Sequence, residues 1–191
     1  MTTVSILGKG NMGGAISAIV SKAGIDAQVI DQAQSGTAVT GDIVILAVPY
    51  AALSDIVATR GAELAGKIVV DVTNPVNFET FDSLVVPADS SATAELAAAL
   101  PDSKVLKAFN TNFAATIANG SLGDLSTTVL IAGDDADAKK TLADIVTEGG
   151  LKAVDAGSVS RARELESIGF LQITLAAAEK VSWVGGFGVV A

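Results

Sequence analysis

Short apolar runs alternate with longer, Ala-rich stretches along this 191-residue chain. The apolar runs predict strands at residues 3–7, 27–30, 43–48, 67–72, 104–109, 127–132 and 152–155. The longer stretches predict helices at residues 11–22, 51–60, 90–100, 134–148 and 158–180. This alternation is typical of right-handed βαβ units, in which helices cover both faces of a parallel sheet. The sequence therefore predicts an α/β fold with a doubly wound, mostly parallel sheet.

One segment interrupts the alternation. Residues 32–41 are polar where a crossover helix would normally join the second strand to the third, so we expect that helix to be missing or very short. No low-complexity linker divides the chain. We predict one domain over residues 1–157, with residues 158–191 as its helical C-terminal extension.

The chain contains no histidine and no cysteine, which removes much of the usual catalytic chemistry. A Ser-His-Asp or Cys-His nucleophile cannot be built, and neither can a zinc site of imidazole or thiolate ligands. Any metal ion would need oxygen ligands alone, and any general acid or base would be a carboxylate, Lys, Tyr or bound water. We expect neither a metal site nor a catalytic side chain.

The formal net charge is −9, from 12 Lys and Arg against 21 Asp and Glu. Nucleic acids bind proteins largely through Lys and Arg that neutralise phosphates, so no nucleic-acid partner is expected. The longest apolar stretch, residues 43–53, contains Pro49 and is too short to span a bilayer, and the N-terminus lacks the features of a secretory signal. We expect a soluble, cytoplasmic protein that binds no membrane.

A glycine-rich motif, Gly8-Lys9-Gly10-Asn11-Met12-Gly13, follows the first predicted strand and opens the first predicted helix. It fits the pattern G-x-G-x-x-G of dinucleotide-binding folds. In that pattern the first Gly permits a tight turn, the second lets the backbone approach a pyrophosphate, and the third lets the helix pack closely on the strand. The pyrophosphate accepts hydrogen bonds from free N–H groups at the helix N-terminus. A turn without a ligand is the alternative, but this context favours an NAD(P)-binding Rossmann domain.

Asp31 lies at the end of the second predicted strand, 18 residues after Gly13. A carboxylate at this place usually accepts hydrogen bonds from the adenosine ribose of NAD and repels the 2′-phosphate of NADP. No Lys or Arg occurs between Lys22 and Arg60, so electrostatics alone favours NAD. Asp31 could instead be a solvated turn residue. Lys9 could favour the pyrophosphate or point into solvent.

Several segments together resemble the family of NADP oxidoreductases that depend on the deazaflavin coenzyme F420. The similar stretches are SILGKGNMGGAI, DIVILAVPYAAL, KIVVDVTNP, KVLKAFNT, VLIAGDDADAKKTLADIV and VDAGSVSRARELESIGFLQITLA, in the family's order. The resemblance implies a Rossmann domain with a short C-terminal extension, which holds a nicotinamide cofactor beside a flat ring acceptor. That family usually has a basic pair such as Ser-Arg where this chain has Asp31-Gln32. The choice between NADP and NAD therefore stays open.

The resemblance also implies where the nicotinamide lies, namely at the carboxyl ends of the central strands. This agrees with the general rule for ligands of open α/β sheets. The residues implied there are Ala47, Val48, Pro49 and Tyr50 after the third strand, Asn74 and Pro75 after the fourth, and Ala108, Phe109 and Asn110 after the fifth. Val48 and Pro49 would offer an apolar surface, and the two Asn amides could bind a carboxamide. Both Asn residues could equally serve ordinary turns and caps.

Few side chains are available for acid–base chemistry. Tyr50, the only tyrosine, could reach the cleft, although a packing or rim position is the more common role. Lys107 lies within a strand, where a lysine more often faces an edge or a carboxylate. Arg161 and Arg163 could clamp an anionic tail, or could pair with Glu164 and Glu166 three residues along the terminal helix.

Three functions are compatible with these observations. The leading hypothesis is hydride transfer between NAD(P)H and a flavin or deazaflavin, because transfer between two cofactor rings needs stacked geometry rather than a proton donor. The alternatives are a non-catalytic NAD(P)-sensing module and a small ketone or imine reductase that uses Tyr50 or Lys107 as its acid. The apolar end of the chain, from Trp183 to Val190, also suggests a homodimer.

Overall fold

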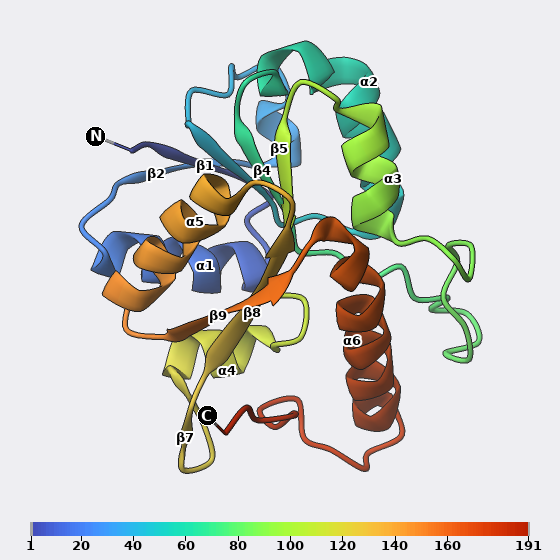
Figure 1. The fold of residues 1–191 in the computed structure, drawn as a ribbon. Helices are drawn as coiled ribbons and strands as arrows, with labels where there is room; N and C mark the ends of the chain where they lie inside the picture. Colours follow the sequence, from blue (N-terminus) through green and yellow to red (C-terminus); the bar gives the residue numbers. More distant parts are fainter. Residues whose placement is uncertain (1, 191) are drawn as a thin grey trace.

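The alternating pattern folds into a seven-stranded sheet with the strand order β2-β1-β3-β4-β5-β8-β9 (Figure 1). The computed structural model describes residues 2–190. The strands of this sheet are β1 (Val4–Leu7), β2 (Ala27–Ile30), β3 (Ile43–Leu46), β4 (Ile68–Asp71), β5 (Lys104–Lys107), β8 (Thr128–Gly133) and β9 (Lys152–Gly157). Strands β1 to β5 are parallel, β8 is antiparallel to β5, and β9 is parallel to β8. The predicted mostly parallel α/β sheet is confirmed, with one antiparallel junction that the pattern did not predict.

Within residues 2–190, six helices surround the sheet. They are α1 (Asn11–Lys22), α2 (Leu53–Leu64), α3 (Ala92–Ala99), α4 (Ala114–Asn119), α5 (Ala136–Glu148) and α6 (Ala162–Ala177), with short 3-10 turns η1 (Gln32–Gln34), η2 (Tyr50–Ala52) and η3 (Val159–Arg161). Neighbouring residues of β3 point to opposite faces, so Ile43 and Ile45 pack with α1, α4 and α5, whereas Val44 and Leu46 pack with α2 and α3. The sheet is therefore covered on both faces, as a doubly wound fold requires.

Two local features were missed by the sequence pattern. Helix α4 and the hairpin of β6 (Ser121–Leu122) and β7 (Leu125–Ser126) are too short to show a periodicity. Strand β5 ends at Lys107, two residues before its predicted end, because Phe109 has a φ of +64° that no strand residue adopts.

The crossover from β2 to β3 has no α-helix, as predicted, and contains only the turn η1. Side chains of α2 hold this crossover in place of the missing helix. Arg60 is only 7% exposed, and its guanidinium donates to the carbonyls of Ser35 and Thr37, with an N–O distance of 2.9 Å for Thr37. The Glu63 carboxylate accepts a 2.8 Å hydrogen bond from the N–H of Val39.

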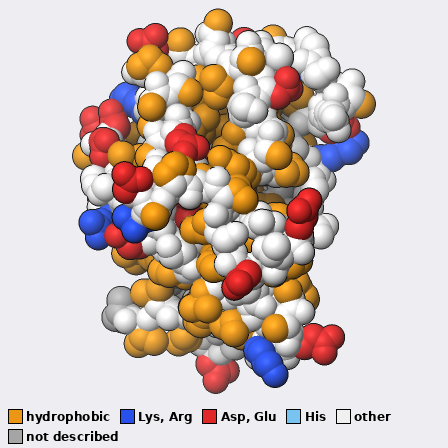
Figure 2. Space-filling view, turned by 90° about the vertical axis from the view of Figure 1, so that its right-hand side faces the viewer, with side chains coloured by type: hydrophobic (Ala, Val, Ile, Leu, Met, Phe, Trp, Pro, Cys, Tyr) orange, Lys and Arg blue, Asp and Glu red, His pale blue; other side chains and the backbone are white. Residues whose placement is uncertain are grey.

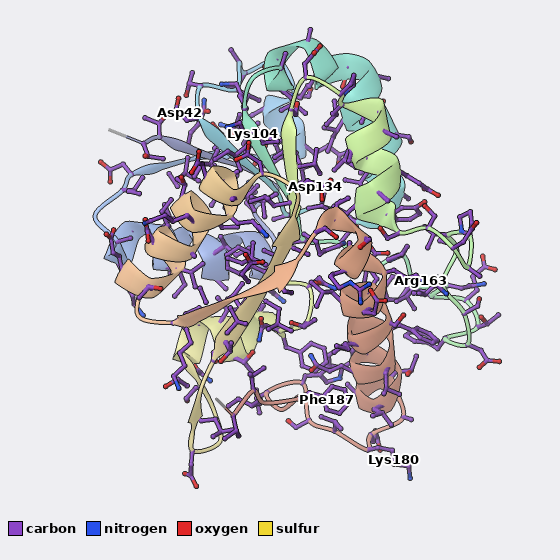
Figure 3. All side chains as sticks on the ribbon, in the orientation of Figure 1. Asp42, Lys104, Asp134, Arg163, Lys180 and Phe187 are labelled. Atoms are coloured by element: carbon purple, nitrogen blue, oxygen red, sulfur yellow. The ribbon has the colours of Figure 1, made fainter. Side chains whose placement is uncertain are left out.

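Helix α6 stands beside the sheet, and the chain after it turns back toward α4 and the β6–β7 hairpin (Figure 1). Trp183 packs on Phe113 with ring centroids 5.0 Å apart, and the N–H of Phe187 donates to the side chain of Gln172 over 3.1 Å. Figure 3 shows Phe187 in this returning segment, between α6 and the hairpin. The segment of residues 178–190, here called the C-terminal tail, is thus anchored at two points.

Hydrophobic side chains gather in patches on the face that carries α6 and the loop after β4 (Figure 2). Exposed members of these elements include Phe78, Phe81, Val85 and Leu171. None of the helices within residues 2–190 is long and apolar enough to cross a membrane.

Candidate functional site

The turn between β1 and α1 is shaped by two glycines that no other residue could replace without movement. Gly8 has a φ of +107°, and its N–H donates to the carbonyl of Ile30 over 2.8 Å. A Cβ at Gly8 would collide with the carbonyl of Ala47, and a Cβ at Gly13 would collide with the carbonyl of Gly8. These contacts bring the start of α1 against the end of β1, and the glycine turn against the end of β3.

Gly10 differs from its two neighbours in the motif because a Cβ there would meet no atom within 4 Å. The residue is exposed and stands directly before the first turn of α1. No side chain caps this helix, and its first turn contains no acidic residue. The first N–H groups of α1 thus have no side-chain cap at a positively polarised helix end, which suits the pyrophosphate of a dinucleotide.

Asp31 lies beside this turn and forms an ion pair with Lys9. One carboxylate oxygen of Asp31 also accepts a 3.0 Å hydrogen bond from the N–H of Gln34, whose side chain returns to the N–H of Asp31. The bond to the Lys9 ammonium is the main reason why the pKa of Asp31 lies below its ordinary value of 3.8. Asp31 is therefore a fixed, ionised carboxylate, and Lys9 is drawn toward it while staying largely exposed.

The residues after β3 and β4 lie at the same edge of the sheet as the glycine turn. Ala47, Val48 and Asn74 are partly exposed and Pro49 is exposed, so their side chains can meet a ligand. Pro75 is buried.

The residues after β5 are placed differently from the prediction. Ala108, Phe109 and Asn110 are 0%, 2% and 4% exposed, so their side chains do not flank an open cleft. Phe109 has a positive φ, which ends the extended backbone directly after β5. These three residues can shape the site from behind but offer little surface to a cofactor.

Asn74 and Asn110 contact each other. Nδ2 of Asn74 donates to the carbonyl of Asn110, and Nδ2 of Asn110 donates to Oδ1 of Asn74, each over 2.9 Å. Nδ2 of Asn110 also donates to the carbonyl of Leu165 on α6 over 2.9 Å. The pair therefore joins the loops after β4 and β5 to the C-terminal helix.

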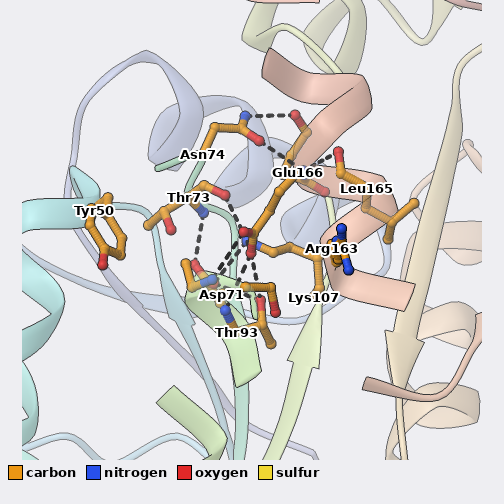
Figure 4. A network of polar contacts seen from close by, with 12 residues as sticks. Tyr50, Asp71, Thr73, Asn74, Thr93, Lys107, Arg163, Leu165 and Glu166 are labelled. Atoms are coloured by element: carbon orange, nitrogen blue, oxygen red, sulfur yellow. Dashed lines mark hydrogen bonds and ion pairs between the residues drawn. The ribbon is translucent and has the colours of Figure 1, made fainter. Parts of the chain in front are cut away.

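Lys107 is fully buried and cannot act as an acid on a bound substrate. Its ammonium lies 2.8 Å from a carboxylate oxygen of Asp71 and 3.0 Å from one of Glu166, and all three side chains are 0% exposed (Figure 4). Asp71 and Lys107 stand opposite each other in the register of β4 and β5. The sequence pattern that could have predicted this contact is the presence of one charged residue, Asp71 or Lys107, near the end of each of two neighbouring apolar strands.

The terminal helix forms only one of its two predicted ion pairs. Arg161 lies 3.5 Å from Glu164, as predicted. The predicted pair of Arg163 with Glu166 is wrong, because Glu166 points into the core and binds Lys107 while Arg163 is exposed on the outer side of α6 (Figure 3).

Tyr50 lies at the rim of a cavity of about 350 Å³ between α2 and α3. Its hydroxyl donates to the carboxylate of Glu95 over 3.3 Å. Burial, and next the Glu95 charge, raise the pKa of Tyr50 above its ordinary value of 10.0. A tyrosine with a raised pKa gives up its proton less readily, so Tyr50 is a poor general acid. Within residues 2–190, no three or more carboxylates cluster as metal ligands would.

Comparisons with known proteins agree with this geometry. The sequence model of the family "NADP oxidoreductase coenzyme F420-dependent" matches residues 27–75. The chain is 38% identical to the metalloreductase STEAP3 of Rattus norvegicus over 106 residues, which are 56% of this chain and 20% of that protein. A crystal structure from Arthrobacter sp. FB24, described as a candidate F420-dependent NADP reductase, covers all of both chains with a TM-score of 0.87 at 22% identity, which shows a shared fold.

The F420-dependent NADP reductase of Methanocaldococcus jannaschii is 32% identical to this chain over 165 residues. The match covers 82% of this chain and 72% of that protein. The resemblance seen in the sequence segments is thus confirmed. The protein belongs to the F420-dependent NADP reductase family and is an NAD(P)-dependent oxidoreductase.

Proposed function

We propose that this protein transfers hydride between NAD(P)H and a flavin or deazaflavin acceptor. The observation that carries the proposal is the shared edge of the sheet, at which the glycine turn, Val48, Pro49 and Asn74 all lie, while the two candidate acids are engaged in other contacts. Lys107 is buried in an ion pair, and the Tyr50 hydroxyl is bound to Glu95. Reduction of a carbonyl or imine would need a proton donor, whereas transfer between two rings depends on their position.

Each part of the dinucleotide has residues suited to it. The N–H groups that follow Gly10 suit the pyrophosphate, and the Asp31 carboxylate suits the hydroxyls of the adenosine ribose. Val48 and Pro49 give the nicotinamide ring an apolar, water-excluding surface, and Asn74 offers an amide to its carboxamide. A bound nicotinamide supplies or takes up the hydride. Contact residues in this proposal are Gly8, Lys9, Gly10, Asn11, Met12, Asp31, Ala47, Val48, Pro49, Tyr50 and Asn74, supported from behind by Gly13, Pro75, Ala108, Phe109 and Asn110.

The Lys9–Asp31 pair bears on the choice of dinucleotide. The family supports NADP, but the Asp31 carboxylate would repel a 2′-phosphate. The Lys9 ammonium lies against that carboxylate and is the nearby cation that could neutralise a 2′-phosphate. We therefore propose that both NADPH and NADH are accepted, NADPH with the help of Lys9.

Anaerobic mixing of the protein with NADPH or NADH and either FMN or coenzyme F420 tests the proposed reaction. We expect the absorbance of at least one oxidised acceptor to fall at the same rate as the absorbance of the reduced nicotinamide. A protein that binds the dinucleotide but reduces neither acceptor would contradict hydride transfer and favour the sensing module.

We also propose that the protein forms a homodimer through its C-terminal tail. Trp183, Val184 and Val190 are 54%, 58% and 82% exposed although they are apolar. Apolar side chains gathered on one short segment are typical of a surface that another chain covers.

A further inference from the structure

The buried cluster around Lys107 joins four elements of the fold. Lys107 on β5 contacts Asp71 on β4 and Glu166 on α6, and it also donates to the carbonyl of Thr73 over 2.6 Å (Figure 4). Glu166 in turn accepts hydrogen bonds from the first N–H groups of α3, with a distance of 2.9 Å for Ala92. All three donor sites of the ammonium are occupied.

Stability alone is a weak reason for such a cluster. Two carboxylates and one ammonium leave an excess negative charge in the core, and apolar side chains of similar volume often stabilise a fold equally well. Hydrogen-bonded charges do, however, specify one arrangement of the elements that carry them. The cluster therefore fixes β4, β5, α3 and α6 relative to one another, together with the groups that these elements hold.

Two routes lead from the cluster to Asn74. Along the chain, Lys107 holds the carbonyl of Thr73, the residue directly before Asn74. Through α6, the carbonyl of Leu165, next to Glu166, accepts from Asn110, which is paired with Asn74.

Helix α6 also confines Asn74 sterically. Gly169, three residues after Glu166, lies so close to Asn74 that a Cβ would collide with Oδ1 of Asn74 and would lie 2.9 Å from the carbonyl of Asn110. The side chain of Asn74 is thus enclosed by α6 on one side and by Asn110 on the other.

These contacts decide which way the Asn74 amide points. Leu165 offers a carbonyl, which can only accept, so the atom of Asn110 that faces it must be Nδ2. The same Nδ2 faces Asn74, whose contacting atom must therefore be Oδ1. Nδ2 of Asn74 then uses one hydrogen on the carbonyl of Asn110 and has a second hydrogen left, on a residue that is partly exposed.

We propose that Lys107, Glu166 and Gly169 are positioning residues that hold Asn74 as a hydrogen-bond donor to the nicotinamide carboxamide. This inference rests on the proposed function, because it is there that Asn74 meets the nicotinamide. None of the three residues touches the cofactor. Their effect should therefore be confined to the nicotinamide half of the dinucleotide.

Two ligands separate this role from a general effect on folding. NADPH carries the nicotinamide, whereas 2′-phospho-ADP-ribose contains the rest of the molecule without it. We expect Gly169→Ala to lower the affinity for NADPH about 3–10-fold, which is the effect of one lost hydrogen bond. The affinity for 2′-phospho-ADP-ribose should change less than about twofold. Asn74→Ala should give the same pattern, and Gly169→Ala should add little in the Asn74→Ala background.

Ser167→Ala is the matched control on the same helix, because its exposed hydroxyl bonds only to the carbonyl of Arg163. It should leave both affinities unchanged. Glu166→Gln should lower the affinity for NADPH selectively, as Gly169→Ala does, provided that the variant folds, which thermal unfolding shows. If it does not fold, Gly169→Ala alone tests the inference. Equal weakening of both ligands, or unchanged NADPH affinity in Gly169→Ala, would overturn the inference. A wild-type protein that binds both ligands and reduces no acceptor would overturn the proposed function alone.

Discussion

At the residue scale, Asp31 shows how neighbours decide what a side chain can do. Its place after β2 is the place of a ribose-binding carboxylate, and the N–H of Gln34 and the Lys9 ammonium hold it there. Because Lys9 lowers the pKa of Asp31 below its ordinary value of 3.8, the carboxylate is ionised at neutral pH, and its stabilising contact is lost only when the pH falls through that lowered pKa.

Replacement of this carboxylate should change the preference between the two dinucleotides. In Asp31→Asn we expect the ratio of NADPH to NADH affinity to rise about tenfold, because a charge that repels the 2′-phosphate is removed. Both proteins are compared at about pH 8, where the Asp31 carboxylate and the 2′-phosphate of NADPH are each ionised. Fluorescence titration measures both ratios. Asp42→Asn is the control, because it removes an exposed carboxylate that binds Thr3. Equal changes in the affinities for NADPH and NADH in Asp31→Asn would contradict a place for Asp31 beside the adenosine ribose.

The glycines of the first turn should separate folding from binding. Gly13→Ala places a methyl group on the Gly8 carbonyl and should lower the melting temperature. In Gly10→Ala the added methyl group meets no atom within 4 Å, so the melting temperature should stay within about 2 °C of the wild-type value. The affinity for the dinucleotide should nevertheless fall at least about tenfold, because the methyl group lies where the pyrophosphate approaches the backbone. Thermal unfolding and cofactor titration of the two variants test this, and unchanged affinity in Gly10→Ala would argue against a pyrophosphate at this turn.

At the element scale, the crossover after β2 is stable without its usual helix. The carbonyls of Ser35 and Thr37 and the N–H of Val39 are bound by Arg60 and Glu63 of α2. The carbonyl of Ala38 accepts from Gln28 on β2. Arg60, which is itself buried, thus ties an exposed polar crossover to α2.

Removal of that guanidinium should destabilise the fold. We expect Arg60→Met to lower the free energy of unfolding by about 2 kcal/mol, since it removes charged hydrogen bonds to two carbonyls. Arg163→Met removes an exposed arginine and should change it by less than about 0.5 kcal/mol. Urea unfolding measures both values, and equal effects would show that the crossover does not depend on Arg60.

At the scale of the whole molecule, the anchored tail leaves apolar side chains exposed. If this surface is the proposed dimer interface, light scattering should give twice the chain mass of 19.1 kDa. Trp183→Ser combined with Val184→Ser should shift the protein toward monomer. The control Phe78→Ser removes an apolar side chain that is 60% exposed on the loop after β4, and it should leave the dimer intact. A monomeric wild type would contradict the interface.

Much of the framework could be predicted from the pattern of residues along the chain. Helix α1 and strand β2 have their predicted ends, and the missing crossover helix was visible as a polar gap. These features follow from patterns within about ten residues, where periodicity and glycine chemistry act directly. The glycine turn was predictable from the spacing of its glycines, although Gly8 also lies against the carbonyl of Ala47, which is far along the chain.

Other features were decided by the tertiary structure. The spacing along the helix predicted an ion pair between Arg163 and Glu166, but the fold places Lys107 of β5 beside Glu166 instead. A buried ammonium needs carboxylate partners, and the packing of the elements decides which carboxylates are within reach. Likewise the direction of β8, the burial of Phe109 and the pairing of Asn74 with Asn110 depend on residues far apart in the chain. The sequence by itself thus determined the layers and the glycine turn through local chemistry, and its resemblance to known sequences indicated the family. Only the packed molecule decided which polar groups meet, because burial leaves each of them few possible partners.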